Sequence, residues 1–262
     1  MSGTESIRSE EQLREHVVKS GSFSPERNRA IFDACFSGAR AKDRMFEAMA
    51  REFHLDRRRV CDAGCGYGAH LVRCGPGSFG IDIDKEKIAF ARAIGLDAHA
   101  RDLVHDDLAD LPRADAVWCS AIIEHLDAPH VFLRKLNSLL EPGGLLLLET
   151  PVLAPLPWLG RLPLPKFRDV FLGDHPDHVN AFTPGTIRHA CEYAGFATKK
   201  MFRWSLPIVN RAPFLPLRLT GLPPFSAVAR AVMYVGEKIP GWDYPERASR
   251  RASDNRQGYV RK

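Results

Sequence analysis

One stretch of the chain, residues 60–72 (Val-Cys-Asp-Ala-Gly-Cys-Gly-Tyr-Gly-Ala-His-Leu-Val), constrains the fold more than any other. A short apolar strand runs there into a turn with glycine at positions 64, 66 and 68, and we expect a helix to start directly after it. Glycine reaches backbone conformations that are closed to other residues, and its missing Cβ lets a ligand lie against the main chain. At a helix N-terminus such a turn is typical of nucleotide binding.

A carboxylate follows the turn at a telling distance. Asp82, in Gly-Ile-Asp-Ile-Asp at 80–84, comes eighteen residues after Gly64, where one βαβ unit places the acidic group that binds ribose hydroxyls. Dinucleotide enzymes use the spacing G-x-G-x-x-G, and Ala69 occupies the last glycine position, which tolerates alanine. Spacing alone therefore leaves an NAD(P)-dependent oxidoreductase open beside an S-adenosylmethionine enzyme.

Four motifs, in the same order along the chain, favour the second class. The stretch 62–68 resembles the D-x-G-C-G-x-G motif of class I S-adenosylmethionine-dependent methyltransferases. The later matches are 115–120 with 123–126, then 140–144, then 178–184 with 194–196, so that the resemblance covers residues 58–200. It implies an α/β fold, a Rossmann-like doubly wound sheet of seven strands in the order 3-2-1-4-5-7-6, with the last strand antiparallel, N-terminal helices, and apolar insertions after strands five and six.

The resemblance also implies a cradle for S-adenosyl-L-methionine. Its members are Asp62, Gly64, Cys65 and Gly66 near the methionine part, Asp82 on the ribose, Ile83, Asp102 and Leu103 around the adenine, and Cys119 through its backbone. A quinone-precursor branch of the family can also hold a divalent metal with two glutamates and a histidine. Ala121 stands where the first glutamate would lie, so we expect no metal.

His125 is the candidate catalytic residue. It follows the fourth predicted strand, and histidine can accept a proton from a hydroxyl near neutral pH. The alternative, equally open, is that Glu124 and His125 only shape the turn between strand and helix. His175 and His178 flank a proline and lack the spacing of metal ligands on a helix, so we expect a turn or a lid residue there.

Two stretches, 151–177 and 204–227, are rich in proline, leucine, phenylalanine and tryptophan. Insertions after strands five and six lie at the ligand-binding edge of such a sheet, so they predict a lid or wall for a small, largely apolar substrate, methylated on oxygen. Contact with a membrane surface is a further possibility, through Trp158, Phe167, Phe171, Trp204 and Phe214. A catalytically silent S-adenosylmethionine-binding regulator or assembly subunit also stays open, because fold alone does not establish turnover.

Composition narrows the partners and the compartment. The net charge is +5, and the tail 241–262 carries six basic against three acidic residues, or +3 of that excess, so we expect no nucleic-acid partner. The chain has six cysteines without a C-x-x-C pair, and no apolar signal segment, which predicts a cytoplasmic protein. We expect one domain over 1–262, with a helical cap (1–56), a cofactor-binding core (57–202) and the basic tail.

The remaining periodicity assigns the elements. Ser9 to Gln12 forms a capping box for a helix that ends before Gly21, Pro25 starts a second helix, and Met45, Phe46, Met49 and Phe53 recur at helical spacing, either as core contacts or as a roof over the site. The expected strands are 59–63, 79–83, 97–101, 115–119, 144–149, 196–202 and 229–235, with helices over 85–94 and 184–194, the latter capped by Thr183.

Overall fold

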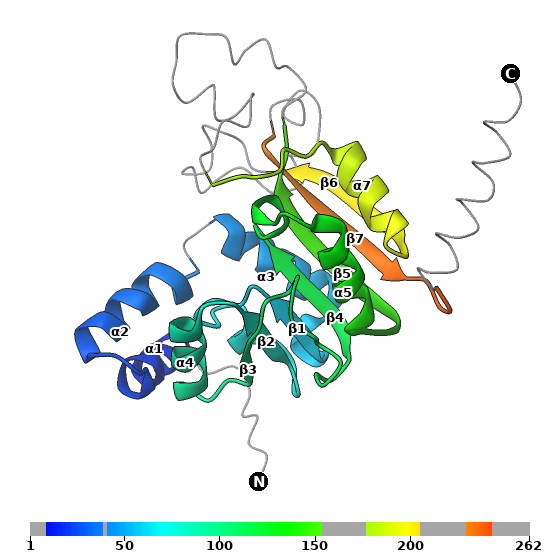
Figure 1. Ribbon diagram of the computed structural model, residues 1–262. Coiled ribbons are helices and arrows are strands. Elements are labelled where there is room, and N and C mark those ends of the chain that lie inside the picture. Colours follow the sequence, from blue (N-terminus) through cyan, green and yellow to red (C-terminus); the bar gives the residue numbers. More distant parts are fainter. Residues whose placement is uncertain (1–8, 39–40, 154–176, 205–228, 243–262) are drawn as a thin grey trace, which may run out of the picture.

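The computed structural model describes residues 9–38, 41–153, 177–204 and 229–242. Seven strands form one sheet in the order β3-β2-β1-β4-β5-β7-β6, in which β7 runs antiparallel to both neighbours (Figure 1). They are β1 (Val60–Ala63), β2 (Phe79–Asp82), β3 (Ala98–Ala100), β4 (Ala114–Ser120), β5 (Leu140–Pro151), β6 (Phe196–Trp204) and β7 (Ala231–Lys238). The topology predicted from the motifs is confirmed.

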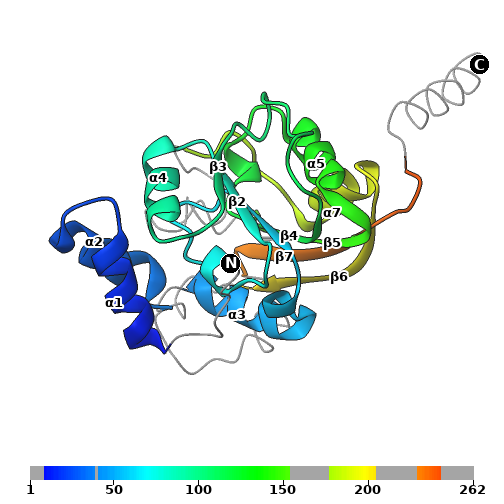
Figure 2. The ribbon, with the colours of Figure 1, turned by 90° about the horizontal axis from the view of Figure 1, so that it is seen from below.

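Helices cover both faces of this sheet. The α-helices are α1 (Glu10–Ser20), α2 (Pro25–Ile31), α3 (Ala41–Phe53), α4 (Lys85–Ala93), α5 (Pro129–Ser138) and α7 (Pro184–Tyr193). Figure 2 shows α5 and α7 on one side of the central strands and α3 on the other. Leu146 and Leu148 of β5 pack in the core on the α5 side, and Leu147 packs in the core on the α3 side. The leucine run is thus a strand buried on both faces.

The N-terminal helices form as the sequence predicts. The Ser9 side chain accepts a hydrogen bond from the Gln12 N–H, which completes the capping box of α1. Met45, Phe46 and Met49 of α3 are buried in the core on their face of the sheet, so they are core contacts. α1, α2 and the π-helical turn Phe32–Phe36 that follows share a separate core with α4, in which the rings of Phe36 and Phe90 lie 6.5 Å apart.

The helix expected directly after the glycine turn does not form. Residues 64–70 make a series of turns that ends in a single 3-10 turn, Leu71–Arg73. A helix nucleus is costly, and three glycines followed by the Gly-Pro-Gly at 75–77 leave too few good helix formers to extend one. The prediction was wrong because the residues expected to form the first turns of the helix belong to the glycine turn.

A second correction concerns Trp204. This residue is the last of β6 and is 4% exposed, packed in the same core as Trp118 and Met233, so its side chain is not available for the membrane contact that we considered possible. Trp158, Phe167, Phe171 and Phe214 lie outside the described residues, as do most of both insertions and of the basic tail. Among the helices that the structure describes, none has both the length and the apolar character to cross a bilayer.

Gly64→Ala tests how tightly the turn is built, with Gly143→Ala as the matched control. Both glycines have positive φ, +80° and +76°, but a Cβ at Gly64 would lie 2.3 Å from Cδ1 of Ile122, whereas a Cβ at Gly143 meets nothing within 4 Å. The backbone conformation should cost each variant about 1–2 kcal/mol. Overpacking should cost Gly64→Ala roughly a further 1–3 kcal/mol in the free energy of unfolding, measured by urea titration. Equal losses would contradict this packing.

Candidate functional site

The glycine turn is tied to the end of β2. The N–H groups of Gly64 and Cys65 donate to the carbonyl of Ile81, at 2.8 and 3.0 Å. The Gly66 N–H donates to Oδ2 of Asp82 at 2.8 Å, and the Asp84 N–H donates to Oδ1 of Asp82 at 2.9 Å. The structure therefore brings the predicted residues of the turn and Asp82 together, and one carboxylate fixes the shape of the turn.

Asp62 lies directly below this turn with its carboxylate buried. Its side chain accepts a backbone hydrogen bond from Leu71, while Oδ2 is buried and has no hydrogen-bond partner among the described residues. Burial raises the pKa of Asp62 to about 6. A buried carboxylate oxygen with spare hydrogen-bonding capacity at a bare-backbone turn fits a ligand that carries a cationic amino group there.

The other predicted cofactor residues differ in what they offer. Ile83 is 68% exposed beside Asp82, and its apolar surface could cover one face of a flat ring. Asp102 caps its own loop: Oδ1 accepts from the N–H groups of Val104 and His105, at 2.7 and 3.0 Å. Burial alone would raise the pKa of Asp102, but the hydrogen bonds from His105 and the backbone lower it.

Leu103 and Cys119 are buried in the core on the α5 side, at 8% and 0% exposure. Burial raises the pKa of the Cys119 thiol well above its ordinary value, so this thiol stays protonated near neutral pH. The side chain of Cys119 thus belongs to the core, and its backbone lies within β4, in register with Ala63 of β1 and Leu148 of β5. The predicted backbone contact of Cys119 with the cofactor stays a prediction.

His125 stands at the end of a 3-10 turn, Ile123–His125, that follows β4. Its Nδ1 lies 2.7 Å from the carbonyl oxygen of Asp177. A carbonyl only accepts hydrogen bonds, so Nδ1 must carry the hydrogen, and Nε2 of the neutral ring keeps its lone pair. Nε2 is 3.9 Å from Oε1 of the buried Glu124. The ring is therefore oriented with its basic nitrogen available, next to a carboxylate.

The segment 177–180 holds a second histidine beside the first. The N–H groups of Val179 and Asn180 both donate to the Glu124 carbonyl at 2.9 Å, which fixes this segment to the turn after β4. The rings of His125 and His178 meet edge to face, with centroids 5.0 Å apart. We expected His178 only as a turn or lid residue, and no sequence signal marks this pairing because the two histidines are distant along the chain.

Glu124, His125 and His178 each offer a ligand atom within 4.8 Å of the others, so this group of the described residues could hold a metal ion. Oε2 of Glu124 also accepts from the Thr150 hydroxyl at 2.9 Å. We based the expectation of no metal on Ala121, which offers no ligand atom, and on the spacing of His175 and His178. That reasoning did not consider His178 together with Glu124 and His125. Ala121 instead adopts a positive φ of 55° at the end of β4.

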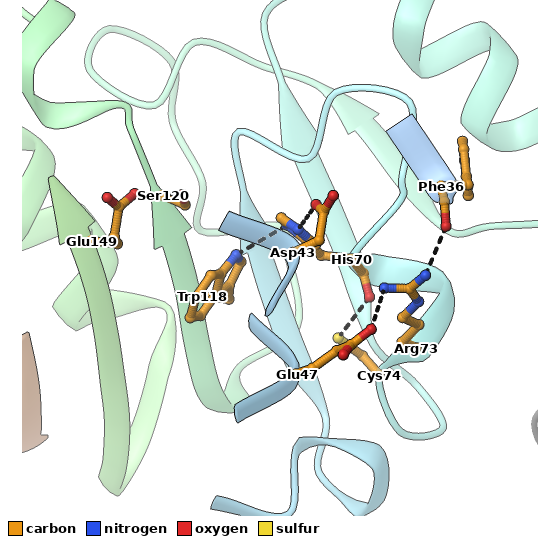
Figure 3. Close-up of polar contacts among 9 residues, drawn as sticks. All are labelled: Phe36, Asp43, Glu47, His70, Arg73, Cys74, Trp118, Ser120 and Glu149. Carbon is orange, nitrogen blue, oxygen red and sulfur yellow. Dashed lines mark hydrogen bonds and ion pairs between the residues drawn. The ribbon is translucent and has the colours of Figure 1, made fainter. Parts of the chain in front are cut away.

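A second carboxylate at this edge was not predicted. Ser120 and Glu149 are register partners on β4 and β5, and the Ser120 hydroxyl donates to Oε2 of Glu149 at 2.7 Å (Figure 3). Burial raises the pKa of Glu149 to about 7. The signal available in the sequence was that each of two adjacent buried strands ends in a polar residue, but the pairing needs the strand register.

Comparison with known proteins identifies the family. The profile of a family described as "Methyltransferase domain" matches residues 37–200. The chain belongs to this methyltransferase family. The resemblance indicated by the four motifs is therefore confirmed, and so is the fold class that it implies.

Individual methyltransferase relatives agree with this assignment. A ubiquinone biosynthesis O-methyltransferase of Alkalilimnicola ehrlichii is 33% identical over 37% of this chain and 42% of its own. A Mycolicibacterium smegmatis protein named as an S-adenosylmethionine-dependent methyltransferase is 33% identical over 53% of this chain and 52% of its own. The matches thus span about half the length of these relatives. A solved S-adenosylmethionine-dependent methyltransferase from Archaeoglobus fulgidus shares the fold, with a TM-score of 0.54 and 21% identity over 79% of this chain and 98% of its own.

The pH dependence of stability tests the burial of Glu149. Its pKa is about 7 in the native protein against an ordinary 4.5, so between these values the native state keeps a proton that the unfolded state releases. Stability is therefore undiminished below about pH 4.5 and falls as the pH rises toward 7. Glu149→Gln cannot ionise, so it should lose less stability between pH 5 and 8, and at pH 8 it should be more stable than the wild type by about 1–3 kcal/mol.

Thermal unfolding across this pH range measures the difference. Asp62 has a pKa raised in the same direction, but it is present in both proteins and cancels in the comparison. The exposed Glu141 provides the control, since Glu141→Gln should leave the profile unchanged. A Glu149→Gln profile parallel to the wild type would show that the carboxylate is not buried as described.

Proposed function

We propose that this protein is an S-adenosylmethionine-dependent methyltransferase that methylates an oxygen of a small, largely apolar molecule. The family membership supports methyl transfer, and the name of the Alkalilimnicola relative, an O-methyltransferase, supports an oxygen acceptor. The observation that carries the proposal is the His125 ring, whose Nδ1–H is held by the Asp177 carbonyl so that Nε2 is free to take a proton. A catalytically silent regulator would not need this arrangement.

Asp62 and Asp82 would hold the cofactor. Asp82 already accepts two backbone N–H bonds, and its carboxylate oxygens retain lone pairs for the ribose hydroxyls. The free Oδ2 of Asp62 would face the amino group of the methionine part, and the exposed Ile83 would lie against the adenine. When bound, S-adenosylmethionine supplies an electrophilic methyl group on a sulfonium.

His125 would handle the proton of the acceptor hydroxyl. The Asp177 carbonyl fixes the tautomer, and the carboxylate of Glu124, 3.9 Å from Nε2, would stabilise the imidazolium that forms. General-base help of this kind contributes about 10²–10⁴-fold. The rest of the acceleration would come from holding the acceptor in line with the methyl group and away from water.

The substrate class rests on the apolar character of the neighbourhood. Val179 is 69% exposed next to His178, so it offers apolar surface beside the polar groups of the site, and small-molecule sites combine apolar surface with few polar groups. The two apolar insertions would add a lid, and a peripheral membrane contact remains part of the proposal for their aromatic residues. We propose no nucleic-acid partner, because the basic excess gathers in the tail 241–262.

We also propose that the protein is cytoplasmic. All six cysteines are free, four of them buried, and burial raises the pKa of the thiols of Cys61, Cys65 and Cys191. Unpaired thiols throughout the chain are expected of a protein kept in a reducing compartment.

Asp82→Asn tests the cofactor site. The variant loses the charge of an acceptor whose hydrogen bonds contribute about 1.5–3 kcal/mol, so affinity for S-adenosylhomocysteine should fall roughly 10- to 100-fold in a calorimetric titration. Asp97→Asn, at an exposed residue before β3, is the control and should bind as the wild type does. Unchanged affinity of Asp82→Asn would remove Asp82 from the cofactor site.

His125→Ala tests the proton transfer. The wild type is first incubated with S-adenosylmethionine labelled with ¹³C on the methyl group and with a small-molecule extract, and NMR of the product identifies the atom methylated. Turnover of His125→Ala on that product's precursor should then fall roughly 10²–10⁴-fold, with affinity for S-adenosylhomocysteine unchanged. The exposed His189, on α7, gives the control variant His189→Ala.

Each alternative has its own outcome in this assay. Full turnover by His125→Ala would remove the histidine from the mechanism, and label in nucleic acid or protein would end the small-molecule proposal. Repeating the assay with EDTA distinguishes His125 as a general base from His125 and His178 as ligands of a cation. A base role leaves the wild-type rate unchanged, whereas loss of the rate, restored by Mg²⁺, would mean that Glu124, His125 and His178 hold a cation.

A further inference from the structure

The imidazole of His70 lies between α3 and the sheet, just after the glycine turn (Figure 3). Its Nε2 is 3.1 Å from Oδ1 of Asp43, a residue of α3 that is 1% exposed. On its other side, Nε1 of Trp118 donates to Nδ1 at 3.2 Å. The ring of Phe46 stacks on the imidazole with centroids 4.6 Å apart. The helix α3, the strand β4 and the turn that follows β1 therefore all meet at this one histidine.

These contacts fix the protonation of the ring. An indole N–H only donates, so Nδ1 of His70 must present a lone pair to Trp118. The hydrogen of the neutral ring then lies on Nε2, where it is donated to Asp43. A second proton would have to sit on Nδ1 and point at the indole N–H, which sets two donors against each other in a buried place. The geometry thus favours a neutral His70 with its hydrogen on Nε2.

The consequence falls on Asp62. Asp62 and Trp118 are register partners on β1 and β4, so their side chains point to the same face of the sheet. A positive charge on the His70 ring would lower the pKa of the Asp62 carboxyl. A cationic His70 would satisfy that carboxylate electrostatically and would repel a cationic ligand approaching it. A neutral His70 leaves the Asp62 charge for the ligand.

The other charged groups near His70 and Asp62 either have a partner of their own or stay the same whether His70 is neutral or protonated. From α3, Asp43 bonds His70 and Lys42 acts on Asp62. From β2, Asp82 acts on Asp62 as a like charge. Below the ring, the guanidinium of Arg73 donates to the Phe36 carbonyl at 2.7 Å and lies 3.5 Å from the Glu47 carboxylate. Among these groups, His70 is thus the one whose charge depends on the hydrogen bond that it accepts from Trp118.

We propose that the Trp118 indole N–H keeps His70 neutral, so that Asp62 is reserved for the cationic methionine end of the cofactor. His70 is a positioning residue in this account, and Trp118 selects its tautomer. The inference rests on the proposed function, since it assumes that S-adenosylmethionine is the ligand of the turn. It adds a role for a histidine and a tryptophan that the sequence motifs do not mark.

Trp118→Phe provides the test, because phenylalanine keeps an aromatic ring against Phe46 and His70 but lacks the N–H. The ¹⁵N NMR spectrum of wild-type His70 should show the neutral ring with its hydrogen on Nε2 between pH 6 and 8. In Trp118→Phe, Nδ1 of His70 no longer faces the indole N–H, so the ring should take up a second proton there on acidification. Affinity for S-adenosylhomocysteine should then fall on acidification by on the order of tenfold more than it does for the wild type.

Trp204→Phe is the matched control, because Trp204 is a buried tryptophan of the same core that does not contact His70 in any described hydrogen bond. It should keep both the wild-type spectrum and the wild-type pH dependence. The amino group of the ligand titrates alike in all three proteins, so a pH dependence that changes only in Trp118→Phe follows from His70 and its effect on Asp62.

The outcomes separate this inference from the proposed function. A wild-type His70 that is doubly protonated at pH 7, or that carries its hydrogen on Nδ1, overturns the inference, and this spectrum needs neither ligand nor variant. Parallel affinity profiles for wild type and Trp118→Phe, with clear binding, overturn the inference and leave the proposed function standing. Absence of S-adenosylhomocysteine binding by the wild type at every pH overturns both.

Discussion

The hydrogen bond from the Gly66 N–H to the Asp82 carboxylate is the contact on which the rest of the site depends. With the two N–H groups that donate to Ile81, it closes the glycine turn onto β2 although no α-helix follows to hold it. His70, at the end of this turn, binds Asp43 of α3. It also leaves room for Ile122, the start of the segment that carries His125. One carboxylate therefore organises the cofactor side and, through packing, the side that would handle the proton.

Side-chain alternation divides these tasks between the two faces of the sheet. Consecutive residues of a strand point to opposite faces, and at the end of β5 Glu149 meets Ser120 while Thr150 meets Glu124. Asp62, Trp118 and Glu149 face the α3 side. Glu124 and its neighbour His125 belong with the α5 side, where Ile123 packs. The cofactor lying across the ends of β1 and β4 would thus have its cationic amino group near the α3 side of the sheet. The hydroxyl of the substrate, whose proton is removed, would lie near the α5 side.

The fold was predictable because its signals are local. Glycine spacing, the carboxylate at the end of β2 and the leucine run each lie in one short stretch and predict strands of an α/β fold. The order of the seven strands followed from the resemblance to the family and is the observed one. The absence of a helix after the turn and the burial of Trp204 depend on what packs around them, so local sequence signals did not predict either feature. The pairs Ser120 with Glu149, His125 with His178 and Asp43 with His70 join residues far apart in the chain, and they exist only once register and helix docking are set.

The central claim is that the glycine turn, Asp62 and Asp82 form a site for S-adenosylmethionine and not for a dinucleotide. Calorimetric titration of the wild-type protein with S-adenosylmethionine and, separately, with NADH tests it most directly. The account predicts saturable binding of S-adenosylmethionine, displaced by S-adenosylhomocysteine, and no heat of binding with NADH. Saturable binding of NADH together with no binding of S-adenosylmethionine would contradict it.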